Sequence, residues 1–158
     1  MGIRYLITLL LLLSLSISAP VLSSDEGLIT VKSKFSVAET LNRLSRVLEE
    51  KGIAIMARIS HSDGARKAAL SLRPTELLLF GNPKLGTPLM QGNQTVGIDL
   101  PMKVLAWKDE NGQVWLTYND PVYFAKRHGV DNRRSVIDKM SKALKQFTAL
   151  AVGSSKNR

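Results

Sequence analysis

The chain contains no cysteine and few aromatic residues, and it has no acidic residue before Asp25. Without cysteine it can form no disulfide and can carry no lipoprotein anchor, whose acylated residue is a cysteine. Two histidines without cysteine leave too few soft ligands for a structural zinc site. The signatures Gly-x-Ser-x-Gly and Gly-x-x-x-x-Gly-Lys are also absent. We therefore expect no metal and no cofactor, and an enzyme is the less favoured class.

Basic residues are in excess, with 22 Lys and Arg against 13 Asp and Glu, which gives a formal net charge of +9. Such a surface favours anionic partners, although a high net charge also serves solubility alone. For an exported chain, an anionic component of the cell envelope is a more natural partner than nucleic acid. We expect no nucleic-acid binding.

Residues 1–23 are typical of a secretory signal peptide. Arg4 is their only charge, an apolar run follows from Leu6 to Ile17, and small residues come next. Cleavage after Ser18 and cleavage after Ser23 both fit this pattern. An uncleaved anchor is the alternative, because the run is shorter than the roughly 20 residues that span a bilayer. We expect a periplasmic or secreted protein.

Periodicity and capping signals predict one domain at residues 28–152, between a short linker at 24–27 and a disordered tail at 153–158. The sequence predicts strands at 28–35, 53–59, 77–80, 99–107 and 114–118, and helices after Ser36, after Ser62 or Asp63, after Asn82, at Asp120-Pro121 and from Asp131 or Asn132, with a polar loop at 91–97. The strand at 77–80 is apolar throughout, which is typical of a strand buried on both faces. The order β-α-β-α-β-(α)-β-β-α-α predicts an α+β fold with helices packed on a largely antiparallel sheet.

The segment after Phe80 holds an unusual density of residues that shape the backbone. Asn82 can cap a helix, Pro83 suits its first position, and Lys84 falls in the first turn. Thr87 repeats the pattern of a cap followed by proline one turn later. Free N–H groups at a helix start and a lysine together favour an anion. The alternative is a rigid connection with no ligand.

Polar residues also follow two other predicted strands, His61 after one and Asp120 after another. We therefore predict a ligand-binding site, for a small anionic or polar molecule, made of His61, Asn82, Lys84, Thr87 and Asp120. One alternative is an enzyme in which His61 and Asp99 or Asp120 form an acid–base pair. The second histidine, His128, is expected to end a helix.

Three aromatic residues, Trp107, Trp115 and Tyr118, lie on the predicted hairpin, where cross-strand packing is the commoner use of such residues. A second alternative is therefore a dimerising interaction protein that uses the hairpin as its interface. A haem would require a His or Met axial ligand, but nothing in the spacing of the methionines singles haem out. The four after Met1 are expected to fill the core, namely Met56, Met90, Met102 and Met140.

The combination of motifs resembles the domain of unknown function called DUF302. The resemblance rests on His61, Phe80-Gly81-Asn82-Pro83-Lys84, Gly86-Thr87-Pro88-Leu89-Met90, Ile98-Asp99-Leu100-Pro101, Trp107, Gly112 and Tyr118-Asn119-Asp120-Pro121. It covers about residues 28–152 and implies an α+β domain that pairs into homodimers. It implies no activity, cofactor or catalytic residue. We expect a non-catalytic binding module.

Overall fold

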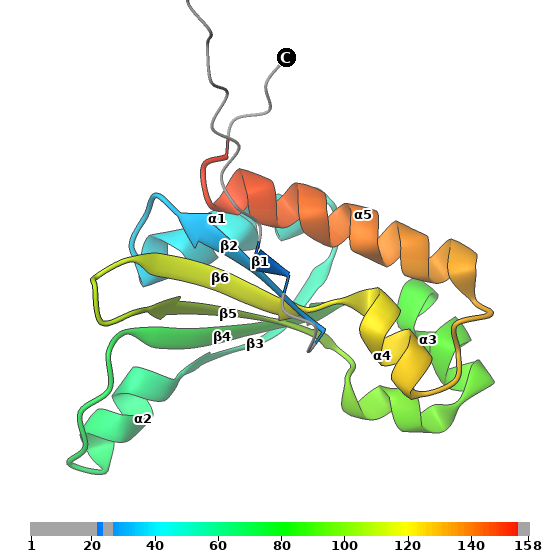
Figure 1. Ribbon diagram of the computed structural model, residues 1–158, viewed down its shortest axis with the longest axis horizontal. Helices are drawn as coiled ribbons and strands as arrows, with labels where there is room; N and C mark the ends of the chain where they lie inside the picture. The colour runs from blue at the N-terminus through cyan, green and yellow to red at the C-terminus, as the bar shows by residue number, and fades with distance from the viewer. Residues whose placement is uncertain (1–21, 24–26, 155–158) are drawn as a thin grey trace, which may run out of the picture.

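The computed structural model describes residues 22–23 and 27–154, in which one six-stranded antiparallel sheet carries the helices (Figure 1). The strands run in the spatial order β1-β2-β6-β5-β4-β3. Their bounds are β1 Leu22–Ser23, β2 Leu28–Ser33, β3 Ala54–Ser60, β4 Thr75–Gly81, β5 Met102–Lys108 and β6 Val114–Asn119. The helices are α1 Val37–Glu50, α2 His61–Lys67, α3 Pro83–Gly92, the 3₁₀ helix η1 Gln94–Ile98, α4 Pro121–Arg127 and α5 Arg134–Ala151.

From β2 to α5 the elements follow the predicted order, so the α+β prediction is confirmed. The predicted signal segment falls outside the described residues except for 22–23, and residues 155–158 of the predicted tail do so too. Within the described part of the chain, no helix has both the length and the apolar character that crossing a bilayer requires.

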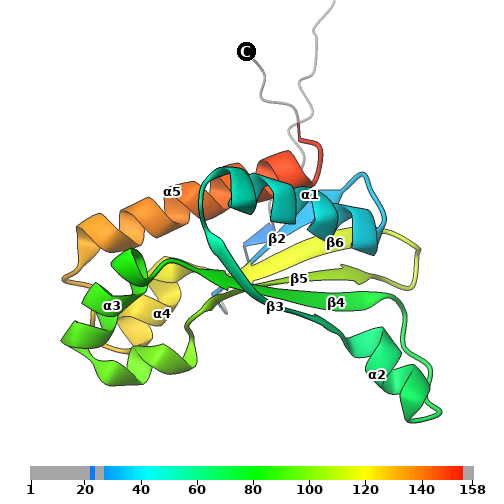
Figure 2. The ribbon, with the colours of Figure 1, turned by 180° about the vertical axis from the view of Figure 1, so that it is seen from behind.

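Helices α1 and α5 pack side by side on one face of the sheet (Figure 2). α1 begins as predicted, because Ser36 Oγ accepts a hydrogen bond from Glu39 N at 3.2 Å. Its apolar stripe is fully buried at Leu41, Leu44 and Leu48. These helices cover one face of β4 and leave the other partly exposed, so the prediction of a strand buried on both faces is wrong. Leu78 and Phe80 are buried, whereas Leu77 and Leu79 are half-buried.

Three local predictions need correction. α2 is capped by Ser60, whose Oγ accepts from Asp63 N at 3.1 Å, rather than by Ser62 or Asp63, and it ends at Lys67. The expected polar loop at 91–97 contains η1, because Asn93 Oδ1 accepts from Thr95 N and starts a helical turn. α5 begins later than Asp131 or Asn132, after Arg133, which makes no side-chain cap.

The end of the sheet where β4 finishes and β5 begins is surrounded by the short helices. α3 follows directly from β4, and the η1 segment leads through a cis Leu100–Pro101 bond into β5. α4 follows β6 at the same end, whereas α2 lies at the opposite end of the sheet (Figures 1 and 2). The helices at this end create the candidate functional site.

Candidate functional site

A pocket of about 280 Å³ opens between α3, α5 and the end of the sheet. Its lining comes from β3, β4, β5, α3, α5 and the segment before β5. The lining residues are Ile53, Met56, Phe80, Gly81, Asn82, Pro83, Leu85, Gly86, Thr87, Met90, Gly97, Leu100, Pro101, Met102, Met140, Ala143, Leu144 and Phe147. None of these described residues is charged, and Asn82 and Thr87 are the only two with polar side chains.

Methionine is frequent in the lining of this pocket. The chain has five methionines, and all except Met1 line it. Met102 and Met140 are buried, each with 6% of its surface exposed, whereas Met56 is 54% exposed. Two of the methionines in the lining are therefore buried, whereas Met56 is in contact with solvent.

A β-bulge directs Met56 toward the pocket. In the pairing of β3 with β4, Ile55 lies opposite Phe80 and Ala57 opposite Leu79, so Met56 is the extra residue. Bulges re-aim a side chain that regular alternation would point elsewhere. The Met56 methyl carbon lies 3.5 Å from the position of a Cβ added to Gly81, at the pocket lining.

The five residues predicted to form a ligand site are not brought together. Asn82 and Thr87 line the pocket, but the Asn82 side chain already accepts from Lys84 N at 2.9 Å as the cap of α3. Lys84 is exposed and does not belong to the lining. Asp120 caps α4 by accepting from Val122 N at 3.0 Å.

His61 lies far from the other four. It follows Ser60, which pairs with Glu76 near the start of β4, whereas Asn82 follows the end of the same strand. The length of this strand is about 20 Å. The structure therefore does not pair His61 with Asp99 or Asp120.

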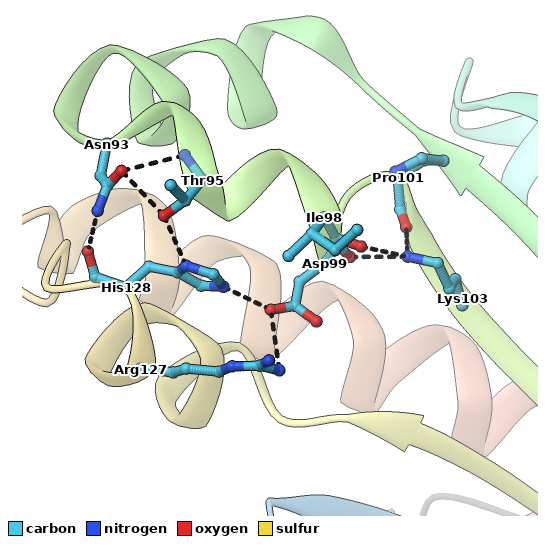
Figure 3. Close-up of polar contacts among 8 residues, drawn as sticks. All are labelled: Asn93, Thr95, Ile98, Asp99, Pro101, Lys103, Arg127 and His128. Atoms are coloured by element: carbon cyan, nitrogen blue, oxygen red, sulfur yellow. Dashed lines mark hydrogen bonds and ion pairs between the residues drawn. The ribbon is translucent and has the colours of Figure 1, made fainter.

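A polar cluster lies where α4 meets η1 (Figure 3). We call it the His128 cluster, and its members are Asn93, Thr95, Asp99, Arg127 and His128. His128 Nε2 lies 2.7 Å from Asp99 Oδ2, and His128 Nδ1 lies 2.9 Å from Thr95 Oγ1. The side chains of His128 and Asp99 are only 8% and 12% exposed.

Asn93 fixes one end of this chain of hydrogen bonds. Its Nδ2 donates to the His128 carbonyl at 2.8 Å, so its Oδ1 is the acceptor that faces Thr95. An ionised Asp99 requires a hydrogen on His128 Nε2, which leaves Nδ1 to accept from the Thr95 hydroxyl. When both ring nitrogens are protonated, Nδ1 donates to Thr95 and the hydroxyl turns to Asn93. Either arrangement pairs the His128 ring with both Asp99 and Thr95.

Residues 93–101, which we call the wall segment, are thus held in place by hydrogen bonds to residues that do not line the pocket. The His128 cluster binds Asn93, Thr95 and Asp99, and Lys103 Nζ donates to the carbonyls of Asp99 and Pro101, each at 3.1 Å (Figure 3). Gly97, Leu100 and Pro101 of the same segment line the pocket. The cluster can therefore position the wall without entering the pocket.

Sequence reasoning singled out His128 and Asp99 of this cluster but did not predict that they pair with each other. His128 was expected to end a helix, and it is indeed the C-cap of α4. Asp99 was considered as a partner for a histidine, but for His61. In the described residues, no group of three His, Cys, Asp or Glu side chains is arranged to hold a metal ion.

Comparison with known proteins identifies a family but no activity. The model of the family described as "Domain of unknown function DUF302" matches residues 29–147. The crystal structure of an uncharacterized conserved DUF302 protein from Bacillus stearothermophilus matches with a TM-score of 0.72 and 20% identity, over 79% of this chain and 98% of that chain. At this identity the likeness shows the fold.

Curated relatives of the chain come from Brucella. The chain is 50% identical over 106 residues to "Fluoride-specific ion channel FluC 1" of Brucella suis biovar 1 and, equally, to the protein of that name from Brucella abortus biovar 1. The match covers 67% of this chain but 42% and 39% of those proteins. The chain therefore spans about two fifths of the length of the curated relatives it matches.

Proposed function

The chain belongs to the DUF302 family, and from that premise we propose that it is a binding module for a small, mainly apolar molecule held in the methionine-lined pocket. The uncharged lining is the observation that carries the proposal. Sites for small molecules are typically concave, mostly apolar and supplied with a few polar groups. An engineered cavity of about 150 Å³ accommodates benzene, so a volume of about 280 Å³ has room for a larger molecule.

The lining favours one polar group on the ligand at most. Asn82 and Thr87 are the polar side chains at the pocket, and their positions suit a hydroxyl or carbonyl. A carboxylate or phosphate inside would lose its hydration without gaining a cationic partner, and burying an unpaired charge is costly. We therefore keep the expectation of a binding module and replace the anionic ligand by an apolar one.

The names of the Brucella relatives suggest fluoride as another ligand. Fluoride is a small, strongly hydrated anion that requires hydrogen-bond donors or cations when it leaves water. Carbon and sulfur atoms form most of this pocket. For this domain we favour an apolar organic molecule over fluoride.

We also propose that the protein is exported, that it meets anionic components of the cell envelope, and that it forms a homodimer. The amino-terminal sequence pattern and the net charge of +9 support the first two proposals. Light scattering tests the third, because a monomer at high concentration would remove it.

Fluorescence of N-phenylnaphthylamine, a neutral apolar dye, tests the binding proposal on the chain from Ala19 onward, which retains β1. We expect saturable binding that Ala143→Leu weakens at least about tenfold, equal to about 1.4 kcal/mol, because the added carbons occupy the pocket. Ala149→Leu, half-buried on the same helix but outside the lining, is the matched control.

Thermal shift with benzoate and phosphate provides the opposing arm. If these anions stabilise the protein, the dye does not bind, and Lys84→Ala removes the stabilisation, the anionic site replaces the apolar one. If neither the dye nor the anions bind, the binding proposal fails.

The His128 cluster favours a second candidate function, an enzyme that transfers acyl groups. A nucleophile, a base within hydrogen-bond reach and a third group that orients the base form the pattern of an activated hydroxyl. Here Thr95 Oγ1, His128 Nδ1 and Asp99 would take these roles. Hydrolysis of p-nitrophenyl acetate tests this candidate, since Thr95→Val and His128→Gln must each abolish any activity.

A further inference from the structure

We propose that the pocket also binds one monovalent soft cation, Cu(I), through methionine sulfur atoms. The observation is that all four methionines after Met1 line a single cavity, although they come from four separate parts of the chain. The inference uses the pocket described above but does not depend on the apolar ligand proposed for it.

Thioether sulfur determines which metal fits. It is a neutral, soft ligand that favours Cu(I), whereas carboxylates, carbonyls and water suit Mg²⁺ and Ca²⁺. Because no charged residue, histidine or cysteine belongs to the described lining, zinc and Cu(II) find no suitable ligand set in it. The lining of the pocket thus favours Cu(I), because it lacks the ligands that zinc and Cu(II) require.

The four side chains approach the cavity from different sides. Met102 from β5 and Met140 from α5 are buried, and Met90 extends from α3 to Gly97 of the wall segment. Its sulfur lies 3.5 Å from the position of a Cβ added to Gly97. Methionine has three rotatable bonds, so its sulfur can move within such a cavity without displacing the backbone.

The positive charge of Cu(I) needs compensation in an apolar pocket. Phe80 and Phe147 belong to the same lining, and the faces of aromatic rings attract cations. Met56, exposed through the β-bulge, offers a first ligand in contact with solvent and an entry path. The metal remains Cu(I) throughout, so binding requires no oxidant or reductant.

Competition with bicinchoninate under anaerobic conditions tests the inference, and Ag(I) serves as a parallel probe that air does not oxidise. We expect one equivalent of Cu(I) to bind. Met102→Leu and Met90→Leu should each weaken binding at least about tenfold, the lower limit for losing a group that merely supports a ligand. Leucine preserves the volume and the apolar surface, so the affinity for the dye should fall by less than the affinity for Cu(I) in both variants.

The variants separate this inference from the proposed function. A loss of Cu(I) affinity that exceeds any loss of dye affinity supports thioether ligation, and sulfur scattering in copper X-ray absorption spectra must accompany it. No Cu(I) binding, or equal affinity in the leucine variants, overturns the inference whatever the dye does. Should Met102→Leu fail to fold, Met56→Leu decides, because this methionine is largely exposed.

Discussion

The two sides of the wall segment, residues 93–101, differ in the contacts that their residues make. On the side of the His128 cluster, Asn93, Thr95 and Asp99 all have hydrogen-bond partners in the described residues. On the pocket side, Gly97 and Leu100 face an open cavity. One side therefore contributes stability, and the other leaves room for a ligand. Substitutions on the two sides should separate folding from binding.

The largest effect should follow Asp99→Ala, which leaves His128 Nε2 without its partner although the histidine side chain is only 8% exposed. A buried polar group left unpaired costs about 1–3 kcal/mol. We expect the free energy of unfolding, measured in urea, to fall by that amount. Arg127→Ala is the control, because this residue is 58% exposed and lies 3.7 Å from Asp99. Loss of the Arg127 side chain should lower the free energy of unfolding by less than about 1 kcal/mol. An equal decrease in both variants would contradict the greater importance of the bond between Asp99 and His128.

A smaller effect is expected from a matched pair of threonine substitutions. Thr95→Val removes a hydroxyl that bonds to His128 and Asn93, at an expected cost of about 0.5–1.5 kcal/mol. Thr87→Val, on the exposed side of α3 at the pocket, should change stability by about 0.5 kcal/mol or less. Thermal unfolding of both variants checks the pair. If Thr87→Val lowers stability more than Thr95→Val does, the assignment of stability to the His128 side and of binding to the pocket side is wrong.

Gly97→Ala should affect binding more than folding. The added Cβ would lie 3.5 Å from Met90 Sδ, an ordinary contact, so the unfolding free energy should stay within about 0.5 kcal/mol. The methyl group narrows the pocket, and binding of N-phenylnaphthylamine should weaken. Gly64→Ala on α2 has open space around its Cβ and should leave dye affinity unchanged. Undiminished binding in the Gly97 variant would place the ligand elsewhere.

The smallest effect concerns a third place, the turn between β5 and β6. The Trp115 indole donates to Asp109 at 2.7 Å, which, with backbone N–H donors, lowers the pKa of the Asp109 carboxyl. A lowered pKa stabilises the fold above the unfolded value near 3.8, and this contribution is lost as pH falls through the folded value. Trp115 fluorescence should therefore change at a pH below 3.8. A transition identical in Asp109→Asn would assign it to another group.

Much of the architecture was accessible from the sequence because local rules determine it. Alternation at 28–35 and the cap at Ser36 predict β2 and α1, and Asn82-Pro83 predicts the start of α3, where the structure has it. The site was less accessible. Polar residues that follow successive neighbouring strands lie at the same end of the sheet only when those strands are parallel. Because β3 and β4 are antiparallel, their carboxyl ends lie at opposite ends of the sheet.

The pairing of Asp99 with His128 escaped prediction for a different reason. The two residues are 29 positions apart, and η1, which brings Thr95 and Asp99 to the same side, has no apolar periodicity in the sequence. The pocket could not be predicted from the sequence, for a related reason. Four methionines in four elements look like core residues until the fold shows that they share one cavity.

The bulge at Met56 has a consequence for the edge of the sheet. β3 is the last strand in the spatial order, so one of its sides presents unpaired backbone groups. Such an edge is a template on which another chain can add a strand and begin an aggregate. The extra residue interrupts the regular repeat that an added strand would need. The bulge that directs Met56 toward the pocket thus also protects this edge against edge-to-edge aggregation.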